Sequence, residues 1–498
     1  MSFTSRLLAF AIVALAFALR VAWLDLKPAH FDEGVNGAFV DAMTHQGYYA
    51  YDPTNFHGPL HFYILFVSQT LFGRSLWALR LPLVLFSTAC VGMMLAFRRQ
   101  LGIGACLLAA FAMATSPGFT FYGRYAIHES EFVFFLMLAT WGLAGLWSKG
   151  ATAHLWATGL GVTGAVLTKE TYVVHLAALG LATVVVWWSG GRARIAEQQW
   201  KMEDLGALTA VCAGLIVFFY SGGFLNWKSL PGLWRTFAPW MATGTRGESG
   251  HEKDWWYWLS LLGRYEWPAL LGLLVTLRLS WRGTNLIARG LAVMTLATLA
   301  VYSAIAYKTP WCLIALAWPL HLLFGYTVLR AARRVDGWLP WIIAAPALAV
   351  SLVLTLQLNF RKFTDEAEPY VYVQTLPDIE KVLTPLRTLV ARDPTARRLH
   401  GHVVVAETHP LPWLLGDFTH VDFLDFDDLP ESLDAAFLLI DEQLQETIEP
   451  LLHHTYFFEP LRLRGQADGT ALLYLRVAEF RDQFPGRAPE FTPAPAAP

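Results

Sequence analysis

The sequence His30-Phe31-Asp32-Glu33 opens a polar and aromatic stretch that closes with His57-Gly58-Pro59-Leu60. This stretch directly follows the first long apolar segment, so it holds an acidic pair and several histidines against a membrane surface. Ionisable groups are costly in such a place unless they are paired or used. We therefore expect the stretch to line a functional cavity, with walls supplied by the rest of the chain.

The composition is that of a membrane protein. Of the 498 residues, 55% are hydrophobic and only 15% are charged, whereas soluble proteins carry about 25% charged residues. The net charge of -2 gives no electrostatic reason to expect nucleic acid as a partner. All four cysteines fall inside apolar runs, so neither a disulfide framework nor a cysteine zinc pattern is present. The first apolar run lacks a small-residue cleavage site and is expected to be a retained anchor.

Apolar runs long enough to cross about 30 Å of hydrocarbon recur as far as residue 358. We count eleven: 6–24, 76–97, 101–117, 129–148, 152–168, 171–188, 205–221, 256–277, 286–306, 311–329 and 338–358. With a cytoplasmic N-terminus, nearly every short basic cluster lies on the inner side, as the positive-inside rule requires. The first loop, 25–75, and the breaks near 118–128, 168–170, 222–255 and 306–310 then share the outer face. The sequence thus predicts an integral protein of the inner membrane with its active site and C-terminal region extracytoplasmic.

Two segments are ambiguous as membrane spans. The run 60–72 is short and follows Gly58-Pro59, which favours an interfacial or re-entrant helix. The run 256–277 holds Arg264, Glu266 and Pro268 near its middle, so it is the weakest span and could instead be an outer helix that leads into a short span.

The membrane module, 1–359, is followed by a region of water-soluble character. We expect a small α/β domain at 360–480, with an amphipathic helix at 377–392 and buried strands at 402–406, 435–440 and 471–477. The Asp-rich stretch 422–428 favours a solvated loop after a strand. The tail 481–498 is rich in proline and alanine and is expected to be disordered.

The acidic pair Asp32-Glu33 has two possible roles, as a general base or as a helix cap. Asp32 and Glu33 are adjacent, so their side chains cannot point the same way, and one can face a cavity while the other supports it. A carboxylate held near a weak nucleophile can accept its proton as a bond forms. Alternatively, Asp32 is the N-cap of the following helix. His57 and His61, four positions apart, allow a metal interpretation, but no third ligand has suitable spacing. No cofactor is predicted, and a divalent cation is not indicated.

Charged residues also stand at three breaks between apolar runs. One break carries Arg124, His128 and Glu129, another Lys169 and Glu170, and the third Tyr307 and Lys308. Basic side chains at such breaks can clamp a phosphate. Alternatively, each break is a turn whose lysine reaches the lipid headgroups, with Glu170 neutralising Lys169. Their shared face favours a common cavity, lined in addition by His57. No glycine-rich phosphate loop is present.

These motifs resemble those of the GT-C group of polytopic glycosyltransferases. The first loop is similar to that of the dolichyl-phosphate-mannose protein mannosyltransferases, where an acidic pair is followed by His-Pro-Pro-Leu, and the layout resembles that of the lipid A aminoarabinose transferases. The resemblance implies that Asp32 is the catalytic base and that Lys169 and Lys308 contact a polyprenyl phosphate. Gly58 replaces the first proline of the motif, and the C-terminal region does not resemble the β-trefoil module of eukaryotic protein mannosyltransferases.

The sequence therefore predicts a membrane glycosyltransferase with about eleven transmembrane helices. It would move a sugar from a polyprenyl-phosphate donor to a lipid, glycan or protein acceptor with inversion, using Asp32, beside Glu33, as base and Lys169, Lys308 and Arg124 at the leaving phosphate. The alternatives are a flippase or transporter of lipid-linked sugars and a non-catalytic scaffold of envelope assembly. We find no inverted repeat, and the charged residues cluster on one face, which favours the transferase.

Overall fold

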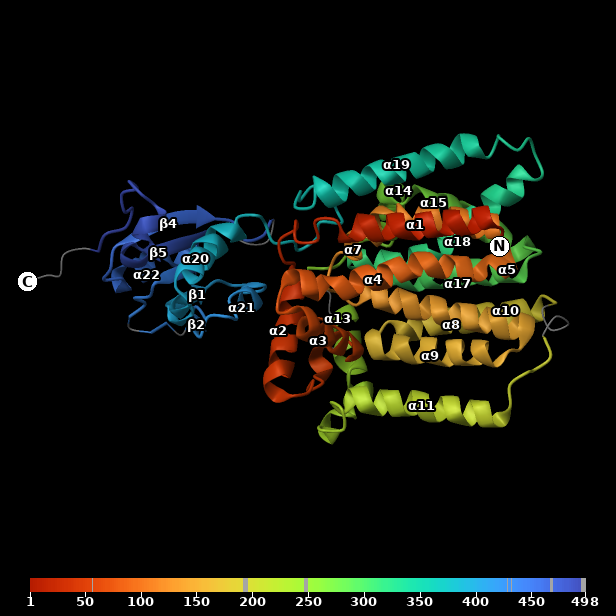
Figure 1. The fold of residues 1–498 in the computed structure, drawn as a ribbon, viewed down its shortest axis with the longest axis horizontal. Helices are drawn as coiled ribbons and strands as arrows, with labels where there is room; N and C mark the ends of the chain where they lie inside the picture. The colour runs from red at the N-terminus through yellow and green to blue at the C-terminus, as the bar shows by residue number, and fades with distance from the viewer. Residues whose placement is uncertain are drawn as a thin grey trace, which may run out of the picture. The chain divides into compact units, whose positions relative to one another are not determined.

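The computed structural model describes residues 1–55, 57–190, 196–245, 250–427, 429–430, 432–465 and 469–493 (Figure 1). The chain forms two compact units. The helical unit comprises Met1–Leu24 and Ala42–Phe363, and the sheet unit comprises Asp25–Asp41 and Thr364–Pro498. The first half of α2 (Phe31–Gln46) therefore packs with the C-terminal region and not with the helices that flank it in the sequence.

Long apolar helices run side by side in the helical unit (Figure 1). In the described ranges, seven helices are long and apolar enough to cross a membrane, and α3, α6 and α10 are apolar but shorter. The helices are α1 (Phe3–Val21), α3 (Leu60–Phe72), α4 (Leu76–Met94), α5 (Arg98–Leu101), α6 (Ile103–Ala114), α7 (Pro117–Tyr122), α8 (Glu129–Lys149), α9 (Thr152–Thr168), α10 (Tyr172–Trp188), α11 (Met202–Tyr220), α12 (Gly232–Arg235), α13 (Phe237–Thr245), α14 (Tyr257–Tyr265), α15 (Trp267–Leu274), α16 (Thr276–Arg282), α17 (Leu286–Ala304), α18 (Leu313–Ala332) and α19 (Trp341–Phe360).

The predicted spans are only partly reproduced as single helices. The short run 60–72 forms one helix with the expected bounds. The run 256–277 does not form one continuous helix, because Glu266 separates α14 from α15, whose first residues are Trp267 and Pro268, and α16 begins at Thr276. The run 101–117 is divided as well, between α6 and α7. The prediction of one helix is therefore wrong for 101–117, whereas at 256–277 the alternative of one helix that leads into another agrees with α14 followed by α15.

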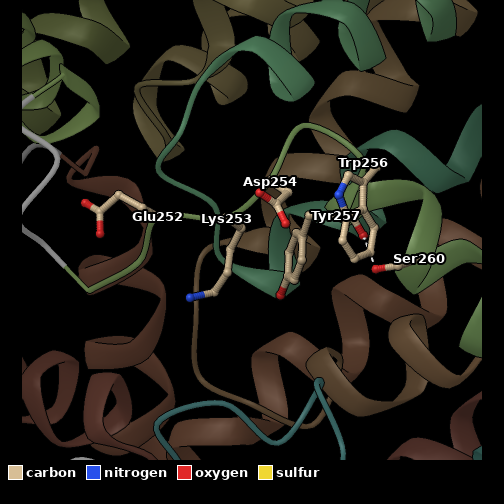
Figure 2. A pocket seen from close by; sticks show the side chains of 6 residues that line it. All are labelled: Glu252, Lys253, Asp254, Trp256, Tyr257 and Ser260. Atoms are coloured by element: carbon tan, nitrogen blue, oxygen red, sulfur yellow. Dashed lines mark hydrogen bonds between the residues drawn. The ribbon is translucent and has the colours of Figure 1, made fainter.

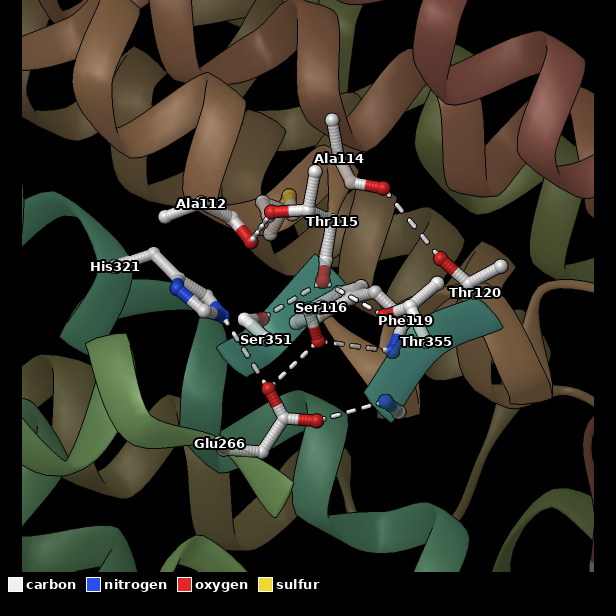
Figure 3. Close-up of polar contacts among 12 residues, drawn as sticks. Ala112, Ala114, Thr115, Ser116, Phe119, Thr120, Glu266, His321, Ser351 and Thr355 are labelled. Carbon is white, nitrogen blue, oxygen red and sulfur yellow. Dashed lines mark hydrogen bonds and ion pairs between the residues drawn. The ribbon is translucent and has the colours of Figure 1, made fainter. Parts of the chain in front are cut away.

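Glu266 holds the break between α6 and α7 together (Figure 3). Its Oε1 accepts the Gly118 N–H at 2.7 Å, and its Oε2 accepts the Ser116 hydroxyl at 2.7 Å. On the other side of the break, the Thr115 carbonyl accepts hydroxyl groups of Ser351 and Thr355, each at 2.7 Å. A carboxylate at the start of a helix satisfies backbone donors that have no partner within the helix. Glu266 is thus a structural residue of the bundle.

The sheet unit contains a five-stranded sheet in the order β2-β1-β3-β5-β4. The strands β1 (His400–Val404), β2 (His420–Phe423) and β3 (Phe437–Asp441) are parallel, whereas β5 (Ala471–Arg476) is antiparallel to β3 and to β4 (Tyr456–Leu461). One face packs against α20 (Ile379–Arg392), and the short helices are α21 (Leu411–Leu414), α22 (Gln445–Ile448) and α23 (Val477–Phe480). The central strands are buried on both faces, which explains their continuous apolar runs.

The predicted helix at 377–392 and the three predicted strands correspond to α20, β1, β3 and β5. The strands β2 and β4 were missed because β2 has only four residues at a sheet edge and β4 carries Glu459-Pro460. Asp422, expected in a loop, lies in β2. The expectation of a disordered tail is wrong as far as Phe491, whose backbone exchanges hydrogen bonds of 3.0 and 3.1 Å with Tyr456. Residues 494–498 lie outside the described residues.

Candidate active site

The acidic motif lies in the first turn of α2. The Glu33 carboxylate is buried, and its Oε2 accepts the His30 N–H at 2.9 Å. This contact is one half of a capping box, in which an acidic side chain satisfies the backbone donor at the helix start. The Asp32 side chain is 36% exposed. Glu33 therefore serves the helix start, and the alternative interpretation of Asp32 as the N-cap does not hold.

A second polar group lies in the helical unit, where several helices begin or end. We call it the histidine–carboxylate cluster; its members are His57, His61, His128, Glu131 and Glu170. His57 precedes α3 and His61 lies in its first turn. His128 and Glu131 lie at the start of α8, and Glu170 lies in the turn between α9 and α10. The structure thus brings together the first loop and two of the three charged breaks.

Two imidazole–carboxylate contacts organise the cluster. His57 Nδ1 lies 2.8 Å from Glu170 Oε2, and His61 Nδ1 lies 3.1 Å from Glu131 Oε2. The ring of His128 lies near both imidazoles, with its centroid 4.5 Å from that of His57 and 3.9 Å from that of His61. His57 is the most exposed member, at 28% of its side chain, so it connects a buried polar group with solvent.

Lys169 and Glu129 form a buried ion pair next to the cluster. Lys169 Nζ also lies 3.5 Å from the Sγ atom of Cys312. Burial alone would lower the pKa of Lys169, but the Cys312 sulfur and the Glu129 and Glu170 carboxylates outweigh burial and hold this pKa well above its ordinary value. The lysine therefore keeps its positive charge inside the protein.

Glu170 is ionised for a similar reason. Burial alone would raise its pKa, but the charge and hydrogen bond of His57 and the charge of Lys169 lower the pKa below its ordinary value. An ionised carboxylate can only accept hydrogen bonds, so His57 Nδ1 is the donor in this contact. His57 thereby has a fixed ring orientation at the open side of the cluster.

Gly58 holds the first loop against the end of α9. Its N–H donates to the Thr168 carbonyl at 3.1 Å. A Cβ atom at this position would lie 2.2 Å from the Leu167 carbonyl oxygen. A proline, as in His-Pro-Pro-Leu, could neither donate this hydrogen bond nor fit beside this carbonyl. The contact brings His57 next to Glu170, so the departure from the motif has a local structural cause.

Arg124, predicted at the donor phosphate, has another set of contacts in the structure. Its guanidinium is buried and donates to the carbonyls of Leu19, Arg20, Ala22 and Trp23 at 2.6–3.2 Å. These carbonyls end α1, where backbone acceptors have no partner within the helix. Arg124 thus closes a helix, and its role at a phosphate stays a prediction.

Lys308 and Tyr307 each contact a residue that lines a pocket. Figure 2 shows the side chains that line this pocket. Residues 251–253 and 306–308 pair as a short antiparallel bridge, and Lys308 Nζ donates to the carbonyls of Lys253 and Ile305. The Tyr307 ring packs on His251 with centroids 5.0 Å apart. The pocket has a volume of 460 Å³, within the range of small-molecule sites. Its lining residues are Glu252, Lys253, Asp254, Trp256, Tyr257 and Ser260.

Three members of this region were not assigned from the sequence. His61 and Glu131 belong to the recognised motifs, but only burial and contact with each other show their part in the cluster. Cys312 was placed in an apolar run, although it follows the Lys308-Thr309-Pro310 break closely enough to reach Lys169. Within the described ranges, no group of three or more His, Cys, Asp or Glu side chains is placed to hold a metal ion.

The chain is similar to known proteins in sequence and in fold. The model of the dolichyl-phosphate-mannose-protein mannosyltransferase family matches residues 56–220. The "Putative mannosyltransferase YkcB" of Bacillus subtilis (strain 168) is 31% identical over 158 residues, which are 29% of this chain and 22% of that protein. ArnT from Cupriavidus metallidurans, bound to undecaprenyl phosphate, superposes with a TM-score of 0.61 at 15% identity over 96% of this chain and 99% of ArnT. Its apo state gives a TM-score of 0.59 at 14% identity over 95% and 98%. The chain has the GT-C fold.

The GT-C resemblance is thereby confirmed, and the apolar helices are those of an integral membrane protein. The number of eleven transmembrane helices is not confirmed. The chain spans about a fifth of the curated relative that it matches. The segment 56–220 contains the whole histidine–carboxylate cluster and Lys169, but Asp32 lies before it. The catalytic roles of all these residues therefore belong to the proposal below.

Gly58→Ala should destabilise the helical unit. The added methyl group meets the Leu167 backbone, so α9 and the first loop must separate, at a cost of about 1–3 kcal/mol in the free energy of unfolding. The thermal midpoint in detergent measures this effect. Gly92→Ala is the matched control, because nothing lies within 4 Å of its added methyl group. Equal midpoints for the two variants would contradict the tight contact.

His128 should make stability fall on acidification. Burial, the neighbouring His61 and His57 and the charge of Lys169 hold its pKa well below the ordinary value. The pKa of a histidine in the unfolded chain is about 6.5. As the pH falls through this value, the unfolded state binds a proton that the folded state does not, and the folded state loses stability. Between pH 7.5 and 5.5, the thermal midpoint of His128→Asn should fall less steeply than that of the unsubstituted protein. The exposed His454, changed to Asn as a control, should keep the original slope. Parallel slopes for His128→Asn and the unsubstituted protein would remove this assignment.

Proposed function

We propose that this chain transfers a sugar from a polyprenyl-phosphate donor to a hydroxyl or amine of a lipid, glycan or protein acceptor, with inversion at the sugar carbon. The observation that carries the proposal is the superposition on ArnT over nearly the whole of both chains, in a structure that holds undecaprenyl phosphate. In this proposal the N-terminus is cytoplasmic, and the reaction takes place on the extracytoplasmic face of the inner membrane, within its lipids.

Asp32 is the general base of the proposed reaction. As the acceptor oxygen or nitrogen attacks the anomeric carbon, Asp32 takes its proton, and the polyprenyl phosphate leaves with the electron pair of the broken C–O bond. The different surroundings of the two acidic residues support this choice. Glu33 is buried in the helix cap, whereas the Asp32 carboxylate is partly exposed and can reach a substrate.

Lys169 is the cation that we place at the donor phosphate. A leaving phosphate gains negative charge in the transition state, and a fixed positive charge in a water-poor setting stabilises it. Lys169 keeps its charge although it is buried, and the neighbouring His57 opens toward solvent. Lys308 is a second candidate, beside the pocket of residues 252–260, with two backbone carbonyls already bound. Arg124 is the third predicted cation, and its guanidinium already binds the carbonyls at the end of α1.

Asp32→Asn should abolish transfer while the protein stays folded. The amide cannot accept the proton, and loss of general-base catalysis lowers the rate by about 10²- to 10⁴-fold. Purified protein in liposomes, supplied with a panel of polyprenyl-phosphate sugars, gives the rate, and thermal unfolding in detergent gives the stability. Asp25→Asn, an exposed carboxylate of the same loop, is the matched control and should keep full activity.

Full transfer by Asp32→Asn would overturn the assignment of the base. Donor movement between leaflets that proceeds without transfer and survives the substitution would instead support a flippase. If the unsubstituted protein shows neither sugar transfer nor donor movement with any donor in the panel, the scaffold alternative is the better explanation.

Lys169→Met should abolish donor binding, but the single change also strands the buried Glu129 carboxylate. Breaking a buried pair costs about 3–5 kcal/mol, so the single variant should be unstable. The double variant Lys169→Met with Glu129→Gln removes both charges and should recover the thermal midpoint. We expect the double variant to show no stabilisation by undecaprenyl phosphate in a thermal-shift titration. A normal ligand-induced shift in this variant would exclude Lys169 from the phosphate site.

A further inference from the structure

We propose that His30 and the segment 370–375 position Asp32 for its role as the base. The contacts that position the base would then come from the C-terminal region. The inference concerns residues within the sheet unit only. It rests on the proposed function for the role of Asp32 as base. Neither the fold nor the proposed chemistry accounts for the segment 370–375.

His30 connects the start of α2 with this segment. Its Nδ1 lies 3.1 Å from the Asp32 N–H, and its Nε2 lies 2.8 Å from the Tyr372 carbonyl oxygen. A backbone N–H can only donate and a carbonyl can only accept, so the imidazole is neutral and carries its proton on Nε2. The His30 side chain is thus a helix cap toward Asp32 and a donor toward the C-terminal segment, and the residue is 2% exposed.

This tautomer has a consequence for the charge of Asp32. Asp32 Oδ2 lies 3.9 Å from His30 Nδ1, a distance that would suggest an ion pair. Because Nδ1 accepts the Asp32 N–H, it carries no proton with which to neutralise the carboxylate. His30 therefore fixes the backbone of Asp32 without protonating its side chain, which is what a positioned base requires. His30 is a positioning residue and not a catalytic one.

The segment 370–375 has a strained backbone at its centre. Val373 has φ = +54°, in the left-handed region, where a β-branched residue is rare and costly. The residues on either side both reach the loop that carries the motif: the Tyr372 carbonyl accepts from His30, and Gln374 Nε2 donates to the Pro28 carbonyl at 3.1 Å. With this backbone turn at Val373, the residues before and after it contact the two ends of Pro28–His30.

The helix α2 is also fixed by close packing at two of its glycines. A Cβ on Gly34 would lie 2.4 Å from the Pro410 Cα, and one on Gly37 would lie 2.5 Å from the Trp413 ring. The Phe31 ring lies 5.1 Å from the Arg464 guanidinium. The helix that carries Asp32 is therefore held both through His30 and through its glycine face. A misplacement of about 1 Å at a reacting group can cost on the order of 100-fold in rate.

Two substitutions test the proposal. His30→Asn keeps an oxygen that can cap the Asp32 N–H but is too short to reach the Tyr372 carbonyl. Val373→Gly relieves the strained φ and makes the segment 370–375 more flexible, which weakens its contacts with Pro28 and His30. For both variants we expect kcat to fall about 10- to 100-fold with the KM for the donor within twofold, and for Val373→Gly the thermal midpoint should stay equal or rise. Lower activity with undiminished stability is a result that a merely structural role would not produce.

His453→Asn is the matched control. It removes another imidazole of the same unit, one that contacts Asp434 near the surface, and should leave kcat unchanged. Hydrogen exchange adds a measurement that needs no substrate: amides of residues 28–37 should exchange faster in both test variants than in the control. Unchanged exchange, or full kcat in His30→Asn, would overturn the proposal. Full activity in His30→Asn together with an inactive Asp32→Asn would refute the positioning role alone, whereas an active Asp32→Asn would refute the proposed function itself.

Discussion

The buried ion pair between Lys169 and Glu129 is the constraint on which the polar end of the helical unit depends. An unpaired charge on either side chain would strongly destabilise the folded protein. The two helix ends that carry Lys169 and Glu129 must therefore lie together. Glu129 begins α8, and Lys169 follows α9. Once they are paired, Glu170 is directed toward His57 because it is the next residue in the turn. The His57–Glu170 contact thus follows from one charged break in an apolar hairpin.

Three other buried charges serve the backbone. Arg20, in the first span, donates to carbonyls of Ala16, Met113 and Ala114, and Arg124 closes the end of α1. Glu266 satisfies the start of α7. A broken helix in an apolar bundle leaves backbone groups that water cannot reach, and a charged side chain is a strong partner for them. A buried charge in this chain therefore marks either a site or a helix end, and only its contacts tell which.

This ambiguity explains how far the sequence could predict the structure. The charged break at 168–170 and the first loop were expected to meet because both interrupt apolar runs on one side. Arg124 carries the same signal, yet its partners are carbonyls about 100 positions earlier, which no local pattern reveals. The residues alone did not distinguish Asp32 from Glu33, and only the family resemblance favoured Asp32, because the choice depends on which side chain turns back to the His30 N–H. The break between α6 and α7 was missed because the carboxylate that binds Gly118 there, Glu266, is 148 positions away.

Sequence distance also shapes how the acidic motif acquires its structure. His30 and the Tyr372 carbonyl are 342 positions apart, and Pro28 and Gln374 are 346 apart. Contacts of such separation form late, because the intervening chain must first be ordered. The start of α2 is thus made early in synthesis but gains its cap partner and its packing against Pro410 and Trp413 only when the C-terminal region has folded. The C-terminal region is in this sense part of the machinery around Asp32, and its loss would disorder the motif even with every membrane helix intact.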